Sequence, residues 1–204
     1  MNELILAVIH DAKNSLGELV FRLEARGGLA AEIESLMHTS NRLTNVLLWH
    51  RQQEGEMPIR IDSASPADLL EEMTIEFGQL FPKLTIESDA GNAPAFWFYD
   101  ETYIRLAMAN ALHNACHFAK EKVQLSAAEL DGKLILIVCD DGAGFSDDML
   151  ARHRENELAD VSRRGTGLGL VLASAIANLH ISKGEHGRVV LGNDQGAVFE
   201  LHLP

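Results

Sequence analysis

The sequence predicts an α+β protein in which an N-terminal antiparallel helical hairpin precedes a domain that combines helices with a β-sheet. Apolar residues recur at steps of three and four along residues 2–25 and 29–53, which is the spacing of one helix face. From residue 59 onward, short apolar runs bounded by turn residues alternate with helical segments, as is typical of an α/β domain. We therefore expect a helical domain at residues 1–54 and an α/β domain at residues 59–204.

The composition excludes several classes of protein. With 204 residues and 47% hydrophobic residues, the chain can form one or two domains with a real core. Seventeen basic and 30 acidic residues give a net charge of −13, which argues against a nucleic-acid partner. No apolar run approaches the roughly 18 residues that span a bilayer, and no signal peptide is evident. We expect a cytoplasmic protein without a membrane span, with Cys116 and Cys139 as buried free thiols.

The first helix carries an apolar stripe with polar residues on the opposite side. At about 100° per residue, His10 lies about 140° and Asn14 about 180° from Ile5. Both side chains are therefore predicted to face solvent. The stripe consists of Ile5, Val8, Ala12, Leu16, Leu19 and Leu23.

The second helix carries a heptad seam, and Gly27-Gly28 supplies the break between the two helices. One such hairpin has too little core to stand alone, but two can close into a four-helix bundle. The seam therefore predicts a homodimer through the N-terminal helices. The alternative is a hairpin docked on its own second domain. The seam residues are Leu29, Ile33, Leu36, Ser40, Leu43, Leu47 and His50.

The second domain can be divided into elements in order along the chain. Ser65 is expected to cap a helix that has Pro66 at its first position, and Asp131-Gly132 marks a hairpin turn. Residues 146–164 are charged and lack apolar periodicity, so we expect a mobile lid there. The expected strands are 59–61, 84–87, 96–99, 123–130, 133–139, 188–193 and 198–203, and the expected helices are 66–80, 100–119 and 168–179.

Asp140 follows the apolar run 134–139, which is typical of a buried strand, so its carboxylate is predicted to lie at the lip of a pocket. Such a carboxylate can accept a hydrogen bond from an exocyclic amine like that of adenine. Glycines follow at Gly142 and Gly144, and a second glycine-rich turn spans residues 165–170. Glycine lets the backbone approach a ligand, and N–H groups at a helix start can hold phosphates. Taken singly, each turn can also be an ordinary loop.

A pair of asparagines lies upstream, on the helix expected at residues 100–119. Asn110 and Asn114 are four residues apart and so share one helix face. An amide oxygen is a hard, neutral ligand that suits Mg²⁺ bridging nucleotide phosphates. A pair of this kind can also be a capping or solvated feature.

In this order and spacing, the three segments resemble the boxes of the GHKL group of ATP-binding domains, and specifically of bacterial sensor histidine kinases. The N box resembles Asn110–Phe118, the G1 box Asp140–Gly144 and the G2 box Gly165–Leu170. The resemblance covers roughly residues 59–204 and implies an α/β sandwich that binds ATP with Mg²⁺ on Asn114 and Asn110. The implied nucleotide-binding residues are Asn110, Asn114, His117, Phe118, Asp140, Gly142, Gly144, Gly165, Thr166, Gly167, Leu168, Gly169 and Leu170.

The segment His10-Asp11-Ala12-Lys13-Asn14-Ser15-Leu16 resembles the phosphoacceptor H box of the same kinases. The resemblance implies that His10 takes the γ-phosphoryl group of ATP, that Asp11 orients its ring and accepts its proton, and that an aspartate of a response regulator receives the phosphoryl group. It also implies that Asn14 can position water to dephosphorylate the regulator.

Several positions depart from the family pattern. His117 replaces the usual Lys or Arg, Ala197 replaces a Ser or Thr, and Ser15 replaces a common Pro. The lid contains no Phe-x-Pro-Phe segment. The chain starts nine residues before His10, so we expect a sensorless cytosolic kinase that takes its signal from a separate sensory or regulatory protein.

More than one interpretation is open for the arginines of the lid and for the activity of the protein. Residues Arg152, Arg154, Arg163 and Arg164 can neutralise phosphate charge or can simply be solvated. The alternative to an autokinase is a histidine phosphotransfer or scaffold protein with weakened or absent ATP use. A third option is a kinase of protein serine residues, which would need neither the hairpin nor His10.

Overall fold

The computed structural model describes residues 3–24, 30–55, 57–154 and 168–204. The chain divides into two compact units, Met1–Pro58 and Ile59–Pro204. The boundary follows the short polar link after the second helix.

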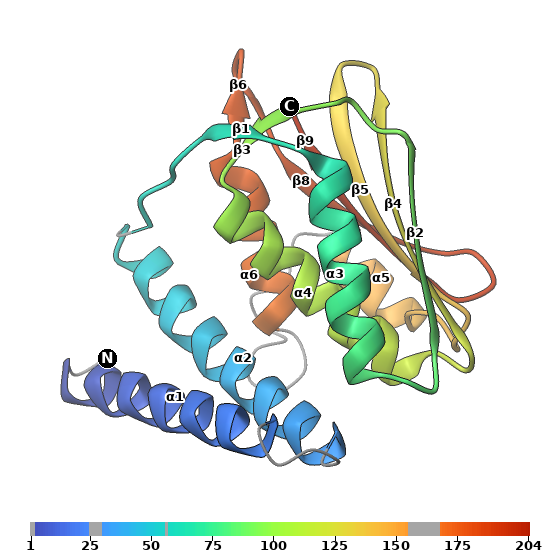
Figure 1. Ribbon diagram of the computed structural model, residues 1–204. Coiled ribbons are helices and arrows are strands. Elements are labelled where there is room, and N and C mark those ends of the chain that lie inside the picture. Colours follow the sequence, from blue (N-terminus) through green and yellow to red (C-terminus); the bar gives the residue numbers. More distant parts are fainter. Residues whose placement is uncertain (1–2, 25–29, 56, 155–167) are drawn as a thin grey trace. The chain divides into compact units, whose positions relative to one another are not determined.

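Two long helices make up the described part of the first unit, α1 (Glu3–Glu24) and α2 (Ala30–Gln53). They contact each other and run in opposite directions (Figure 1). Their bounds agree with the two predicted helices to within one residue. On α1, Leu16 is half-buried, whereas Ala12 and Leu19 are exposed, Leu19 by 45%. Part of the apolar stripe is therefore uncovered within the described chain.

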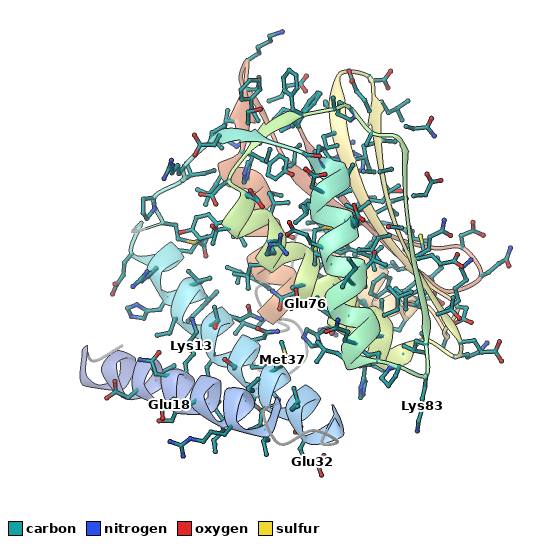
Figure 2. All side chains as sticks on the ribbon, viewed as in Figure 1. Lys13, Glu18, Glu32, Met37, Glu76 and Lys83 are labelled. Atoms are coloured by element: carbon teal, nitrogen blue, oxygen red, sulfur yellow. The ribbon has the colours of Figure 1, made fainter. Side chains whose placement is uncertain are left out.

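Charged side chains occupy exposed positions on both helices. Glu18 forms an ion pair with Arg22 one turn later, at 3.5 Å between Oε2 and Nη2. Glu18 on α1 and Glu32 on α2 extend outward into solvent (Figure 2). Exposed pairs of this kind add little stability because water screens them.

A five-stranded sheet forms the centre of the second unit, with the strand order β2-β4-β5-β9-β8. Strands β2 and β4 are parallel, and every other neighbouring pair is antiparallel. Two small sheets pair β1 with β3 and β6 with β7. The strands are β1 (Asp62–Ala64), β2 (Thr85–Asn92), β3 (Trp97–Tyr99), β4 (Lys122–Leu130), β5 (Lys133–Asp140), β6 (Ile181–Ser182), β7 (Glu185–His186), β8 (Arg188–Asn193) and β9 (Ala197–Leu203), and the helices are α3 (Pro66–Leu80), α4 (Glu101–Phe118), α5 (Asp147–Arg154) and α6 (Leu168–Leu179).

Helices α3, α4 and α6 cover one face of this sheet, so the second unit is the expected α/β sandwich (Figure 1). Side chains alternate between the two faces along each strand. On β4, Val123 and Leu125 are buried and Gln124 between them is exposed. Val138 of β5, the cross-strand partner of Leu125, is buried as well. The apolar core therefore lies between the sheet and the three helices.

Side-chain caps start the two longer helices of this unit. The hydroxyl of Ser65 accepts a hydrogen bond from the Asp68 N–H at 3.2 Å, which confirms the predicted cap of α3. In the same way, the carboxylate of Asp100 accepts from the Tyr103 N–H at 3.0 Å at the start of α4. Both caps satisfy backbone donors that have no partner inside the helix.

Two hairpin turns place consecutive residues in the left-handed region. Asp131 and Gly132 have φ of 53° and 71° between β4 and β5, as the sequence predicts. Lys183 and Gly184 have φ of 50° and 83° between β6 and β7. This second hairpin is not predicted, because its strands of two residues are too short to show alternation.

The strand expected at residues 59–61 is wrong, because β1 begins only at Asp62, which pairs with Tyr99. The Arg60 N–H donates instead to the Asp100 carboxylate at 2.8 Å. Its backbone is thus bound to the start of α4 rather than to a neighbouring strand.

The segment 146–164 is not a loop throughout, because Asp147–Arg154 forms helix α5. The Ser146 hydroxyl accepts from the Met149 N–H at 3.3 Å and starts this helix. The helix has no buried residue, which explains why it shows no apolar periodicity. Residues 155–164 of the expected lid lie outside the described residues.

The length and apolarity needed for a membrane span do not occur together in any helix of the described residues. Both cysteines are free thiols, and Cys116 is buried as expected. Cys139 is only half-buried. It differs from the expectation because it alternates with Val138 and so faces away from the helices.

Candidate functional site

The end of α4 packs directly against the glycine-rich loop that follows β5. A Cβ atom on Gly142 would lie 2.3 Å from the carbonyl oxygen of Phe118, so a larger residue would displace the backbone. The Phe118 side chain is 66% exposed, and its ring contacts that of His117 edge to face, with centroids 5.1 Å apart. The structure therefore brings the segments that resemble the N and G1 boxes together.

Asp141 joins the same two segments through hydrogen bonds that the sequence does not predict. Its carboxylate accepts from the backbone N–H of Lys120 at 2.7 Å and of Glu121 at 3.1 Å. Partial desolvation raises the pKa of this carboxyl, but the backbone N–H donors, with Glu121 first, outweigh it and lower the pKa below its ordinary value. The only local signal for this role is an acidic residue directly before a glycine turn.

Asp140 is the last residue of β5 and is half-buried. Its Oδ1 accepts from the Gly142 N–H at 2.8 Å and from the Ala197 N–H at 3.2 Å. Within the described part of the chain, its Oδ2 accepts no hydrogen bond. Two backbone donors thus orient the carboxylate and leave one oxygen as an acceptor for a ligand.

The start of β9 lies against the end of β5 at the same point. A Cβ atom on Gly196 would lie 1.9 Å from the carbonyl oxygen of Asp140. Ala197 offers its backbone N–H to this carboxylate, so the residue that replaces the usual hydroxyl lies directly beside Asp140.

Helix α4 contacts the start of α6, the segment that resembles the end of the G2 box. A Cβ atom on Gly169 would lie 3.4 Å from the Asn110 side chain, which is buried, whereas Asn114 one turn later is exposed. Leu168, Gly169 and Leu170 are half-buried in the first turn of α6. The N–H groups of a first helical turn have no partner inside the helix and favour anions. The remaining predicted residues of this box, Gly165, Thr166 and Gly167, lie outside the described residues.

The basic residues suggested for phosphate differ in their surroundings. Arg152 is held by Asp148 of the same helix, with contacts of 3.1 Å from Nε and 3.0 Å from Nη2, while Arg154 is exposed. Arg163 and Arg164 lie outside the described residues.

The residues that resemble the H box belong to the first unit. His10 lies in α1, and its side chain is outside the described part of the structure. Asp11 and Asn14 on the same helix are exposed.

A hollow of about 440 Å³ lies elsewhere, on the face of the sheet that the helices do not cover. Cys139, Val198 and Glu200 contribute to its lining. Burial raises the pKa of the Cys139 thiol, and the nearby carboxylates, first that of Asp140, raise it further. Because the hollow lies on the uncovered face of the sheet, it is not the site formed by the three boxes.

The sequence and the fold are similar to those of known proteins. Residues 99–204, more than half of the chain, match the family described as "Histidine kinase-, DNA gyrase B-, and HSP90-like ATPase". The chain is 23% identical over 227 residues to sensor protein KdpD of Clostridium acetobutylicum, covering 100% of this chain but 24% of that relative.

Two solved structures share the fold over the whole chain. Full-length ShkA in complex with AMPPNP has a TM-score of 0.65 and 24% identity, covering 99% of this chain and 45% of that one. Histidine kinase ThkA in complex with response regulator protein TrrA has a TM-score of 0.61 and 20% identity, covering 100% of this chain and 61% of that one. At this level of identity the likeness establishes the fold.

Proposed function

Because this chain belongs to the family of histidine kinase-, DNA gyrase B- and HSP90-like ATPases, we propose that it is an ATP-dependent protein-histidine kinase of a two-component system. The single observation that carries this proposal is the meeting of the Phe118 carbonyl, Gly142 and the Asp140 carboxylate at one edge of the sheet. Gly142 and Gly196 allow the backbone segments to pack this closely, because a Cβ atom on either would collide with backbone.

The Asp140 carboxylate is the proposed adenine anchor. Its Oδ1 is committed to two backbone donors, and its Oδ2 can accept from the exocyclic amine of adenine. The exposed ring of Phe118 offers an apolar surface at the end of α4, and the backbone carbonyl of the same residue lies beside Gly142. Phosphates can then extend toward His117 and the first turn of α6, which starts with Leu168 and Gly169.

The amide oxygens on α4 fit a magnesium ion that is bound by the protein and by ATP together. Asn114 presents an exposed amide on α4, and Asn110 lies one turn before it on the same helix. No group of three or more His, Cys, Asp or Glu within the described residues is arranged to hold a metal ion by itself. This suits Mg²⁺, which commonly takes a few protein oxygens together with substrate phosphates and water. The ion would neutralise charge on the phosphates.

His10 is the proposed phosphoacceptor. A ring nitrogen forms a bond to the γ-phosphorus, the bond from this phosphorus to the bridging oxygen breaks, and ADP leaves with that electron pair. Asp11 accepts the proton from the ring, and Asn14 is the proposed water-positioning residue for dephosphorylation of the regulator. Exposure of Asp11 and Asn14 on α1 supports these roles.

We further propose a homodimer through α1 and α2 and transfer to an aspartate of a response regulator. The exposed Leu19 on the apolar stripe of α1 supports the dimer, since a second hairpin would cover it. The complex of ThkA with the response regulator TrrA supports the partner. A cytoplasmic location follows from the use of ATP, and a separate sensory or regulatory protein is the proposed source of the signal.

Incubation with γ-labelled ATP and Mg²⁺ tests this function. Wild type is expected to gain acid-labile label, His10→Gln to gain none, and His186→Gln, which changes an exposed histidine of β7, to behave as wild type. Acid-stable label would contradict histidine phosphorylation and indicate a serine kinase.

A histidine phosphotransfer protein with weakened ATP use is the second candidate. It is favoured by His117, which stands at an exposed position where the related kinases carry a permanent positive charge. No label from ATP, together with label on His10 from a phosphorylated donor protein, would establish this alternative.

A further inference from the structure

The turn between β8 and β9 is joined to the loop after β5 by one side chain, Asn193. Its Oδ1 accepts a hydrogen bond from the Phe145 N–H at 2.8 Å, and its Nδ2 donates to the Phe145 carbonyl at 2.9 Å. Both backbone groups of one residue are thus held by both ends of one amide. The two residues are 48 positions apart in sequence.

The contact is close as well as polar. Gly144 has a φ of 77°, and a Cβ atom on it would lie 2.8 Å from the Asn193 amide carbon. At the other end of the turn, Ala197 donates to Asp140 at 3.2 Å and Gly196 packs against the Asp140 carbonyl. The turn therefore contacts the loop at both of its ends.

A glycine-rich loop has much conformational freedom to lose when it binds a ligand. In this protein, β5 and Asp141 fix the start of the loop, through strand pairing and through hydrogen bonds from Lys120 and Glu121. Its end, where the chain passes on to α5, is held by Asn193. A loop that is already ordered binds its ligand more tightly, because less entropy is lost on binding.

We propose that Asn193 is a positioning residue that holds Gly144 and Phe145 so that the loop beginning at Asp140 is preformed for ATP. This inference rests on the proposed function. Asn193 acts through the loop backbone and not through contact with the nucleotide.

Asn193→Asp is the sharpest test, because it keeps the size of the side chain and an acceptor for the Phe145 N–H. It replaces the donor with an oxygen that faces the Phe145 carbonyl. Gln195→Glu is the matched control, since it adds the same charge to an exposed position of the same turn. Asn193→Ser, which keeps a shorter hydroxyl, serves if the aspartate variant does not fold.

Asn193→Asp is expected to raise the Kd and the KM for ATP about three- to tenfold, the factor for one lost hydrogen bond. The kcat at saturating ATP should stay unchanged, because the loop affects binding and not the reacting atoms. Without nucleotide, hydrogen exchange at the Phe145 amide should be faster than in wild type. Gln195→Glu should match wild type in all three measurements.

The possible outcomes distinguish the proposed ATP-dependent function from the positioning role of Asn193. Failure of wild type to bind ATP would overturn the proposed function. If wild type binds ATP and Asn193→Asp binds it equally well, the positioning role alone is overturned, even if the variant melts at a lower temperature. The positioning role would also be overturned if Asn193→Asp lowered kcat and left the KM for ATP unchanged.

Discussion

The imidazole of His180, directly after α6, accepts a hydrogen bond of 3.0 Å at Nε2 from the backbone N–H of Asp100, directly before α4. Its Nδ1 lies 2.8 Å from the carbonyl oxygen of Ile176, so this nitrogen carries the proton. The side chain of Asp100 in turn accepts from the Arg60 N–H. One buried ring therefore joins the end of α6 to the start of α4, the two helices that contact each other at Asn110.

This relationship predicts a loss of stability in mild acid. Burial lowers the pKa of His180, although the Ile176 carbonyl and the Asp100 charge oppose the shift. Below about pH 6.5, the usual value for histidine, the unfolded chain therefore binds more protons than the folded one. Stability is full above that pH and falls as pH drops toward the lower folded pKa. Urea unfolding across this range measures the effect.

His180→Gln is the control, since its amide oxygen can still accept from Asp100 but cannot take up a proton. We expect a free energy of unfolding lower by about 1–3 kcal/mol at neutral pH, from the lost bond to Ile176. The decline in acid should be shallower than in wild type, though not absent, because burial also lowers the pKa of His153. An unchanged slope would contradict the role of His180.

Asp140→Asn is expected to weaken ATP binding about tenfold or more, the factor for a hydrogen bond to a charged group. The new amide oxygen can still accept from Gly142 and Ala197, so the fold should persist. The amide then presents a donor where adenine needs an acceptor, and preference for ATP over GTP should fall. Calorimetry with both nucleotides measures this. Asp194→Asn, with the same change of charge in an exposed turn, should bind ATP as wild type does.

His117→Lys is expected to strengthen ATP binding about two- to fivefold, the range for an exposed ion pair. Lysine carries a permanent charge at neutral pH, whereas a histidine is charged only while protonated. The gain should shrink as salt is added, because ions screen an exposed pair. His186→Lys, on the exposed β6–β7 hairpin, should leave the affinity unchanged. An equal gain in both variants would show that net charge alone is responsible.

Gly142→Ala is expected to lower the free energy of unfolding by about 1–3 kcal/mol, because the added methyl meets the Phe118 carbonyl and must displace it. ATP binding should weaken too, since the displaced groups border the proposed nucleotide site. Thermal unfolding and calorimetry measure the two effects. Gly192→Ala is the matched control, as no atom lies within 4 Å of its added Cβ. Equal melting temperatures for the two variants would contradict the close contact.

Cys139 should be a slow nucleophile. Burial raises the pKa of its thiol, and the charges of Asp140 and Glu200 add to the shift, so little reactive thiolate is present at neutral pH. In a Cys116→Ala background, alkylation by iodoacetamide should be slower than that of free cysteine. Glu200→Gln should accelerate it. A rate equal to that of free cysteine, followed by mass spectrometry, would refute the prediction.

The sequence predicts the helices and most strands well because their signals are local. The helices expected at 66–80 and 168–179 have these bounds in the structure. The Asp131-Gly132 turn also forms as predicted, since only a few residues set its backbone angles. Helix α5 is not predicted, because its residues are exposed or only half-buried and therefore show no periodic apolar pattern.

From the sequence alone, the resemblance of Asn114, Asp140 and the glycine turns to a known family predicts which residues bind a nucleotide. How these residues are held is visible only in the folded protein. Asp141 holds the end of α4, Asn193 holds Phe145, and the Arg60 backbone bonds to Asp100 instead of forming a strand. Each of these contacts joins segments 20 or more residues apart. Periodicity and turn propensity depend on residues that are close in sequence. Packing of the sheet against its helices instead brings together residues that are far apart in sequence.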